Sequence, residues 1–457
     1  MKENHNSLIR YKQQMKWICG ASLILTPACI AYPSDKGNPV ELPVNKDRPN
    51  FVVILADDMG YSDVGAFGSK DIRTPNIDKM VSEGMKFTDF HSNGAVSSPT
   101  RCALLTGRYQ QRAGVENVLL VNDAIDKIEG GLPTDEITFA EILRKNGYST
   151  ALIGKWHLGY KEKNNPLNFG FEKYIGFKSG NVDYHSHLNR RGDLDWWDGL
   201  ELKNMPGYTT SLLTDLSCDY IAENKDQPFC LYIAHAAPHS PLQGPSDGPV
   251  RKEASNAEKS SGRSNFDIYR EMVEELDAGV GKVLRTLDKY GLTKNTLVIF
   301  TSDNGPVIEY GGSAGQFKGE KGTVWEGGHR VPCVIRMPET IKPKSVCNIP
   351  LMSFDFFPTI LEMAGVNYDD TGKKLDGVSF VNVLRDGNIK ERTLFWGIGN
   401  DRYAVRQGNW KMVCSGKEKS LYNLESDPEE SVDVSSKNPA IVQNLSQQLE
   451  VWKKSVY

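Results

Sequence analysis

The chain has few cysteines and no excess of positive charge, and both shortages exclude classes of protein. Eight cysteines occur in 457 residues, and the six beyond residue 29 show neither a CxxC pair nor the Cys/His spacing of a zinc site. They are also too few for a disulfide framework, so we expect buried thiols. The formal net charge of −4 argues against the broad basic surface of a nucleic-acid-binding protein.

The sequence also lacks an apolar run of comfortable membrane-spanning length. Its first sixteen residues do carry four Lys or Arg residues ahead of an apolar stretch over residues 17–32. This layout is typical of a secretory signal, which we predict over residues 1–31. The alternative is a lipoprotein signal, because residues 25–29 (LTPAC) loosely resemble the cleavage box before a lipidated Cys29. We expect a periplasmic or secreted protein, anchored by lipid to the outer membrane in the second case.

No internal repeat or low-complexity tract is present, and short apolar runs alternate with helical patterns. This alternation is typical of a large, mostly parallel sheet with helices on both faces, so we predict an α/β fold for residues 47–385. Shorter β-like runs and a final helix then predict a smaller C-terminal α+β subdomain over residues 386–457. The predicted strands are residues 51–55, 151–153, 229–234, 297–300 and 331–335 in the first part, and 393–396, 403–406 and 410–414 in the second.

Polar side chains follow four of the predicted strands of the main sheet. They are Asp57 and Asp58, Lys155 and His157, His235 and His239, and Asp303 and Asn304. Any single pair would be interpreted as a turn or a helix cap. Because the carboxyl ends of parallel strands meet at one edge of a sheet, where ligand crevices form, we expect these side chains in one site.

The expected site combines two kinds of side chain. Its carboxylate and amide groups offer only oxygen ligands, which favours calcium or magnesium over zinc. Its Lys and His side chains, joined by Arg101, offer the donors and positive charge that suit a tetrahedral anion. A metal beside several cations indicates a substrate that carries sulfate or phosphate.

A serine lies next to a predicted helix in residues 96–108 (VSSPTRCALLTGR). Ser98 can cap this helix with Pro99 at its first position, and Gly107 can end it. Ser97 would then lie just before the helix N-terminus, where backbone N–H groups and the helix dipole favour negative charge. The residues by themselves leave open an ordinary serine beside a capped surface helix.

The pattern Ser97-x-Pro99-x-Arg101, followed by LTGR at residues 105–108, resembles the signature of the type I, formylglycine-dependent sulfatases of the alkaline phosphatase superfamily. The serine variant resembles bacterial carbohydrate sulfatases, and the family implies an alkaline phosphatase-like fold. The resemblance covers nearly the whole mature chain. Its further motifs are residues 56–58 (ADD), 74–78 (TPNID), 154–159 (GKWHLG), 238–241 (PHSP), 302–305 (SDNG), 318–319 (KG), 326–332 (EGGHRVP) and 404–411 (AVRQGNWK).

This resemblance implies a role for each matching residue. It implies a calcium ion, in preference to magnesium, bound by Asp57, Asp58, Asp303, Asn304 and the modified Ser97. It also implies a set of catalytic and sulfate-binding residues. These are Ser97, Arg101, Lys155, His157, His239 and Lys318.

The resemblance further implies that a radical-SAM maturase, the expected partner protein, oxidises Ser97 to formylglycine. The aldehyde would hydrate, and one hydroxyl would attack sulfur while the cations stabilise the sulfuryl oxygens. We predict that His239, helped by Lys318, protonates the leaving sugar oxygen. His157 would take the proton of the second hydroxyl, so that sulfate leaves and the aldehyde returns. An unmodified serine has no second hydroxyl and would stop at a sulfated enzyme.

An insertion over residues 180–200 combines aromatic and polar side chains, which suits contact with a sugar. With the secretory signal it favours a sulfated galactose, N-acetylgalactosamine or N-acetylglucosamine of a host or algal glycan over a steroid ester. The alternative is a surface segment that its two tryptophans anchor. The candidate sugar-contacting residues are Asp183, His185, His187, Trp196, Trp197 and, in the subdomain, Arg402.

Two other functions stay open. A phosphonate or phosphate monoester hydrolase of the same superfamily could use the same nucleophile, although the motif at residues 154–159 and Lys318 favour a sulfatase. A non-catalytic glycan-binding protein could keep the fold, but it would show eroded active-site positions, and the sequence shows none.

Overall fold

The structure is a computed structural model that describes residues 48–120, 129–255, 262–368 and 372–457. The predicted signal over residues 1–31 and the candidate lipidation site Cys29 lie outside these ranges. Within them, the model contains no helix with the length and apolar character that a membrane crossing needs.

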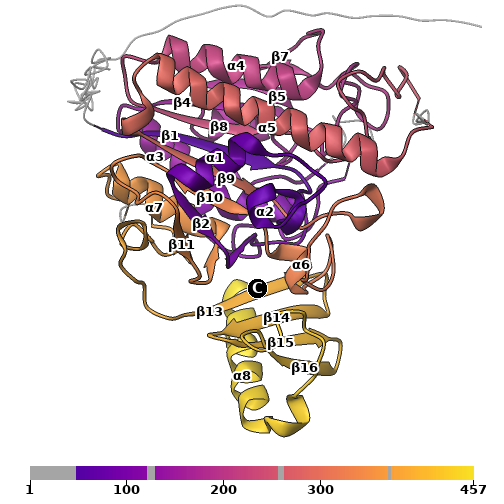
Figure 1. The fold of residues 1–457 in the computed structure, drawn as a ribbon, viewed down its shortest axis with the longest axis vertical. Coiled ribbons are helices and arrows are strands. Elements are labelled where there is room, and N and C mark those ends of the chain that lie inside the picture. The colour runs from indigo at the N-terminus through magenta and orange to yellow at the C-terminus, as the bar shows by residue number, and fades with distance from the viewer. Residues whose placement is uncertain (1–47, 121–128, 256–261, 369–371) are drawn as a thin grey trace, which may run out of the picture. The chain divides into compact units, whose positions relative to one another are not determined.

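A ten-stranded sheet forms the centre of the main part of the chain (Figure 1). Its central pairings, β9–β1, β1–β8, β8–β4 and β4–β5, are all parallel, which confirms the predicted mostly parallel sheet. The strand order is β11 (Ser345–Cys347), β2 (Met85–Phe87), β10 (Cys333–Arg336), β9 (Thr296–Ser302), β1 (Asn50–Ala56), β8 (Phe229–Ala234), β4 (Ser149–Lys155), β5 (Lys173–Phe177), β6 (Trp197–Asp198) and β7 (Glu201–Leu202).

One predicted strand of this sheet runs against the others. The run at residues 331–335 belongs to β10, which pairs antiparallel with β9. A parallel return would need a crossover of a dozen or more residues, usually a packed helix. The only α-helix between β9 and β10 is the four-residue α6 (Glu326–His329), so the chain turns back beside β9 instead.

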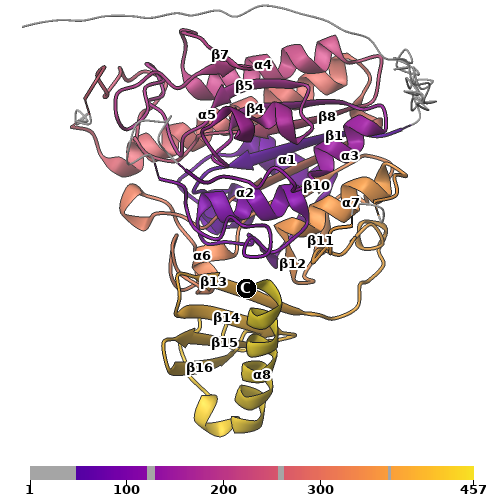
Figure 2. The same cartoon turned by 180° about the vertical axis from the view of Figure 1, so that it is seen from behind.

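Side chains that alternate along β1 pack against helices on both faces of the sheet. Val53 belongs to a buried cluster with side chains of α2, α3 and α7, whereas Val52 belongs to a second cluster with side chains of α1, α4 and α5. Figures 1 and 2 show the two faces from opposite sides. The helices are α1 (Pro75–Glu83), α2 (Ser97–Thr106), α3 (Phe139–Lys145), α4 (Thr209–Glu223), α5 (Asn265–Lys289) and α7 (Phe356–Met363).

The C-terminal part is a four-stranded antiparallel sheet with one long helix, as the predicted α+β pattern requires. The three predicted strands fall within β13, β14 and β15, and a fourth strand, β16, has too polar a sequence (EKSLYN) for its pattern to indicate it. The described residues of both parts lie in one compact unit, and the boundary at residue 385 stays a prediction. The elements are β13 (Thr393–Ile398), β14 (Arg402–Gln407), β15 (Trp410–Ser415), β16 (Glu418–Asn423) and α8 (Pro439–Val456), and a separate pair joins β3 (Phe90–His91) to β12 (Leu351–Met352).

Buried ion pairs join the C-terminal sheet to the main part. Arg406 of β14 donates two parallel hydrogen bonds to the Asp89 carboxylate, at 2.7 and 2.6 Å. Lys411 of β15 lies 2.9 Å from carboxylate oxygens of both Glu326 and Glu430. These charges are almost fully withdrawn from water, so each depends on its partner.

We predict that Arg406→Gln lowers the free energy of unfolding by about 3 kcal/mol, because it leaves the buried Asp89 carboxylate without its main counter-charge. Urea unfolding followed by circular dichroism measures the change. The matched control is Arg402→Gln on the same strand, where the side chain is exposed and the loss should stay within about 0.5 kcal/mol. Equal losses in the two variants would contradict a specific role for the Arg406–Asp89 pair.

Candidate functional site

The polar residues that follow β1, β4 and β9 come together at one edge of the sheet. These strands lie in the order β9–β1–β8–β4, so the ends of three nearly adjacent strands supply Asp57, Lys155 and Asp303. The side chain of Asn304 donates to Asp58 Oδ1 at 2.7 Å, and the Asp58 N–H donates to Asp303 Oδ1 at 3.2 Å. All five side chains are buried, which makes their charges strongly interdependent.

Ser97 reaches this cluster from the first turn of α2. The helix begins at Ser97 after Val96, one residue earlier than the predicted Ser98 cap, because Ser98 Oγ instead accepts the Leu119 N–H at 3.1 Å. The predicted end at Gly107 is confirmed, with a left-handed φ of +69° that favours glycine. Ser97 Oγ donates to Asp57 Oδ1 at 3.1 Å and lies 3.5 Å from Asn304 Oδ1.

Three cations lie against the three carboxylates. Arg101 donates to Asp303 Oδ2 from Nη2 at 2.8 Å and from Nε at 3.1 Å. Lys155 Nζ donates to Asp57 Oδ2 at 2.6 Å and to Ser97 Oγ at 3.3 Å. A third cation, from a lysine that the sequence analysis did not select, covers Asp58.

That third cation is Lys321, and the predicted residue Lys318 is elsewhere. Lys321 Nζ lies 2.7 Å from the Asp58 carboxylate. The exposed Lys318 donates to the Glu430 carbonyl at 3.1 Å and lies 3.8 Å from the centre of the Trp325 ring. The position assigned to Lys318 is therefore corrected to Lys321. The signal in the sequence is the second Lys-Gly pair of KGEKG at residues 318–322, which the prediction passed over.

Crowding of like charges perturbs the acid–base properties of these groups. Burial raises the pKa of Asp303, and the neighbouring Asp57 charge raises it further. Burial also acts to raise the pKa of Asp58, but the charges of Lys321 and His239 outweigh it and lower that pKa. Burial lowers the pKa of Lys155. The pKa of each carboxylate therefore depends on how close it lies to the cations and to the other carboxylates.

Two histidines lie beside the cluster with their ring nitrogens in defined environments. His239 Nδ1 is 2.7 Å from the Ser240 carbonyl oxygen, so it carries the proton, and Nε2 lies 3.5 Å from Asp58 Oδ2. His157 Nε2 is 2.8 Å from the Leu119 carbonyl oxygen, and its buried Nδ1 has no hydrogen-bond partner among the described residues. Burial lowers the pKa of both rings, to about 3 for His239.

A cavity of about 360 Å³ opens onto Ser97. This volume is at the low end of the range of about 300–1,000 Å³ typical of small-molecule sites. Two histidines, two cations and several backbone and amide groups face it, together with an apolar wall. Its lining residues are Val96, Ser97, Val118, Leu119, Leu120, His157, Ser179, Gly180, Asn181, Arg190, His239 and Lys321.

None of the six predicted sugar-contacting residues lines this cavity. Asp183 is buried and accepts four backbone N–H groups, from His185, Ser186, Val250 and Arg251. His187 and Trp196 are buried against each other, with ring centres 4.3 Å apart. For these three residues the prediction of sugar contact is corrected to a scaffold role, because their side chains are almost fully buried and do not line the cavity.

The remaining three candidates for sugar contact are at least partly exposed, but their side chains form contacts away from the cavity. His185 Nε2 is 3.2 Å from the Gly244 carbonyl oxygen. Trp197 donates to Asp195 at 2.7 Å, and Lys178 lies 3.5 Å from its ring centre. Arg402 donates to the Gly322 carbonyl at 3.3 Å. None of the three lines the cavity at Ser97, whereas Asn181 and Arg190 of the same insertion do.

The donor set at the strand ends fits a divalent cation. The oxygens of Asp57, Asp58, Asp303 and Asn304 converge with Ser97 Oγ, and hard cations prefer such oxygen ligands. Burial and the neighbouring Asp57 charge raise the pKa of Asp303 even beside three protein cations, so a further positive charge would be favourable here. His239 also lies close enough to Asp57 and Asp58 to join a metal-binding group.

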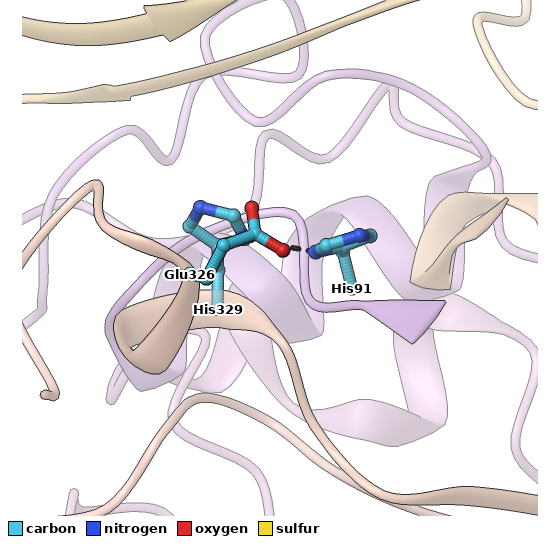
Figure 3. A group of neighbouring side chains, drawn as sticks. All are labelled: His91, Glu326 and His329. Carbon is cyan, nitrogen blue, oxygen red and sulfur yellow. Dashed lines mark hydrogen bonds between the residues drawn. The ribbon is translucent and has the colours of Figure 1, made fainter. Parts of the chain in front are cut away.

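A second group with metal-like spacing, His91, Glu326 and His329, does not fit a metal (Figure 3). His91 Nδ1 and His329 Nδ1 lie 3.0 Å apart, and His91 Nε2 is 2.7 Å from Asp89 Oδ1. Lys411 Nζ is 3.2 Å from His329 Nε2 and 2.9 Å from Glu326 Oε1. One consistent set of protons satisfies this whole chain of hydrogen bonds, and the Lys411 ammonium would repel a cation.

Comparison with known proteins identifies what this arrangement is similar to. The family model described as Sulfatase matches residues 49–366, and the model described as N-sulphoglucosamine sulphohydrolase, C-terminal, matches residues 312–455. N-acetylgalactosamine-6-sulfatase of Rattus norvegicus is 34% identical over 383 residues, which cover 79% of this chain and 71% of the relative. Steryl-sulfatase of Mus musculus is 31% identical over 423 residues, covering 74% and 65%.

Among solved structures, Ps i-CgsB in complex with k-i-k-neocarrahexaose superposes with a TM-score of 0.79 at 29% identity, covering 89% of this chain and 92% of that one. The similarity therefore extends over both the main sheet and the C-terminal sheet. It includes the strand ends at which the buried carboxylates meet.

We predict that removal of divalent cations lowers the melting temperature and that adding one back restores it. At a free-ion concentration a hundred times the dissociation constant, binding should add about 2.7 kcal/mol to the free energy of unfolding. Differential scanning calorimetry with and without a chelator measures this change.

Two variants test whether the strand ends are the binding site. Asp303→Asn should abolish the response to the cation, because it removes one of the converging carboxylates. Asp376→Asn should retain it, because Asp376 pairs with Arg112 in another part of the chain. An unchanged response in Asp303→Asn would place the cation elsewhere.

Proposed function

The chain belongs to the sulfatase family and is a sulfuric ester hydrolase, and we propose that it removes sulfate from a carbohydrate with a formylglycine formed from Ser97. The observation that carries this proposal is the position of Ser97. Its side chain lines the cavity from a helix N-terminus and lies within hydrogen-bonding distance of Asp57 and Lys155. An oxygen nucleophile at this position has both a cationic neighbour and favourable backbone dipoles.

We propose calcium as the cation, held by Asp57, Asp58, Asp303, Asn304 and the modified side chain of residue 97. When bound, the ion would supply Lewis acidity and charge neutralisation for the sulfuryl oxygens. Calcium tolerates a crowded and irregular set of oxygen ligands, whereas magnesium demands nearly ideal octahedral geometry and keeps several waters. Four protein side chains packed this closely suit the larger ion.

The chain's own cations would hold and stabilise the sulfate. Arg101 and Lys155 are fixed by Asp303 and Asp57, so their positive charges are oriented before the substrate arrives. Lys321 lines the cavity and takes the role first assigned to Lys318. Preorganised charges in a water-poor site stabilise the transition state without reorganising during the reaction.

Two histidines are suited to move the protons. His239 lines the cavity, and its Nδ1–H is held by the Ser240 carbonyl. The doubly protonated ring, which the Asp58 carboxylate 3.5 Å from Nε2 favours, would pass its Nε2 proton to the leaving sugar oxygen. His157 is held through Nε2 by the Leu119 carbonyl, which leaves Nδ1 as the base. That base would take the proton of the second hydroxyl of the hydrated aldehyde, so that the bond to sulfate breaks.

A carbohydrate is the substrate class that the relatives support best. N-acetylgalactosamine-6-sulfatase is named for a sulfated amino sugar, and the Ps i-CgsB complex contains an oligosaccharide. The cavity at Ser97 is lined by both polar and apolar side chains, which suits a sugar ring with its hydroxyl edges. Export by the predicted signal and maturation by a radical-SAM enzyme complete this proposal, with action in the periplasm or outside the cell.

The main test is maturation of Ser97. Co-expression with a serine-type maturase should convert Ser97 to an aldehyde two mass units below serine, and sulfate release should rise in proportion to the converted fraction. Peptide mass spectrometry and ion chromatography measure the two quantities. Sulfated sugars should be hydrolysed at least about 100-fold faster than the matched phosphate esters, or roughly 2.7 kcal/mol in transition-state free energy.

Full activity in protein that contains only unmodified serine would refute the proposal that formylglycine at residue 97 supplies the nucleophile. A preference for phosphate would assign the chain to phosphate-ester hydrolysis, and sugar binding without any release would favour a glycan-binding protein. Ser97→Ala is the control for release that does not depend on this residue.

A second prediction distinguishes the two lysines of the KGEKG segment. Lys321→Met should lower kcat/KM for a sulfated sugar by about 100-fold or more, because a charge that faces the sulfate is lost. Lys318→Met should change it by less than about threefold, because Lys318 contacts Glu430 and Trp325 instead. Steady-state kinetics of both matured variants measure the difference, and the opposite order would restore Lys318 to the site.

A further inference from the structure

The insertion at residues 180–200 is a rigid scaffold whose tip reaches the active-site cavity. Its base is held by the buried Asp183 carboxylate, which ties the insertion to the backbone of Val250 and Arg251. The Arg251 guanidinium forms a second link to the insertion, because it donates to the Leu188 carbonyl at 3.0 Å and to Asn181 Oδ1 at 3.1 Å. So many buried hydrogen bonds fix the path of an irregular segment.

The tip is a tight turn over residues 189–193. The buried Asn189 side-chain oxygen accepts the N–H groups of Arg191 at 2.8 Å and of Asp193 at 3.2 Å, and the Asn189 backbone N–H donates to the Asp193 carbonyl at 2.8 Å. Gly192 has a φ of +81°, and a Cβ there would lie 2.3 Å from the Lys252 carbonyl oxygen. The turn is therefore locked against the neighbouring segment, and Arg190 projects from it.

Two adjacent arginines at this tip have different environments. Arg191 lies 3.5 Å from the Asp193 carboxylate, which neutralises its charge. Arg190 is exposed, lines the cavity together with Ser97, and forms no ion pair or hydrogen bond within the described ranges. A positive charge held by a rigid turn, without a protein counter-charge, is available to an anionic ligand.

The whole cavity is biased towards negative ligands. Its lining contains Arg190 and Lys321 as permanent cations and no carboxylate side chain. Lys321 pairs with Asp58 in the cluster at Ser97, whereas Arg190 belongs to the turn at residues 189–193 and lines the same cavity. One sulfate held at Ser97 accounts for Lys321 and leaves Arg190 without a partner.

We infer that Arg190 binds a second anionic group of the substrate, so that the enzyme prefers a glycan unit with two negative charges. The inference rests on the proposed function, because it assumes that the ester to be cleaved lies at Ser97. A second sulfate on the same sugar and the carboxylate of an adjoining uronic acid share the required chemistry. Both are planar or tetrahedral oxyanions that a guanidinium group can bind through two hydrogen bonds.

The test compares matured wild-type enzyme with Arg190→Met, Arg190→Lys and the matched control Arg191→Met. The substrates are galactose, N-acetylgalactosamine and N-acetylglucosamine, each as the monosulfate, as a disulfate and as a monosulfate joined to a uronic acid. An aryl sulfate without a second charged group reports on the chemistry at Ser97 alone. The disulfate and uronate series distinguish the two sources of the second charge.

Arg190→Met should lower kcat/KM for one doubly charged series by about tenfold to a hundredfold, through a higher KM with little change in kcat. The singly charged monosulfates and the aryl sulfate should change by less than about threefold. Arg190→Lys should keep part of the preference, and Arg191→Met all of it. The preference of the wild type should shrink as the ionic strength rises, because the Arg190 site is open to solvent.

The two ways to fail are distinguishable. If matured protein releases sulfate from none of these compounds, the proposed function is wrong and this inference with it. If sulfate is released but Arg190→Met has the same effect on singly and doubly charged substrates, or no larger effect than Arg191→Met, the inference alone is wrong.

Discussion

The structure depends on the balance of charge at the carboxyl ends of β1, β4 and β9. The carboxylates of Asp57, Asp58 and Asp303 are buried away from water. They are linked through hydrogen bonds, since the Asp58 N–H donates to Asp303 and Asn304 donates to Asp58. Buried charges of one sign are tolerated only when opposite charges are fixed beside them. Arg101, Lys155 and Lys321 supply those charges, and each comes from a different element. The sheet edge, helix α2 and the loop before α6 must therefore assemble together, and their assembly brings together oxygen donors that suit a divalent cation.

A second charge network connects the C-terminal sheet to the segment before Ser97, the proposed nucleophile at the start of α2. Arg406 and Lys411 neutralise Asp89 and Glu326, and His91 and His329 lie between them. From His91 the chain continues directly to Ser92, whose N–H donates to the His329 carbonyl at 2.7 Å and whose carbonyl accepts the Trp396 indole N–H at 3.0 Å. The segment before Ser97 is thus held by residues of both parts, which gives the C-terminal sheet a structural role in shaping the site.

The proposed substrate-binding wall is held in place differently from the residues around Ser97. The groups at Ser97 are held by strand ends and a helix, so their geometry is set by the sheet. Part of the cavity lining comes from an irregular segment. In this segment the Asp183 carboxylate accepts a backbone N–H, and the His187 and Trp196 rings pack against each other. Only the turn at residues 189–193 carries a charge that the scaffold does not use. Rigid support for a few exposed polar groups is a common basis of specificity on loops.

The sequence by itself determined the fold class and most of the reactive centre. Apolar runs predicted the strands, and because parallel strands end at one edge, Asp57, Lys155 and Asp303 could be placed together without coordinates. The motif at Ser97 identified the family because its residues are adjacent along the chain. Patterns of this kind can be recognised from the sequence alone, because the residues that form them are close together along the chain.

Only the tertiary structure decided which of two similar side chains reaches the site. Lys318 and Lys321 occupy equivalent Lys-Gly pairs, but the Lys321 N–H donates to the Pro306 carbonyl at 2.8 Å, two residues after Asn304, whereas the Lys318 carbonyl accepts the Gly327 N–H at 2.7 Å. In the insertion, polar and aromatic residues have the same composition whether they face a sugar or the protein. Burial separates them, and it leaves Arg190 rather than His187 or Trp196 beside the cavity. Burial and long-range contacts depend on how distant segments pack, and no local pattern encodes them.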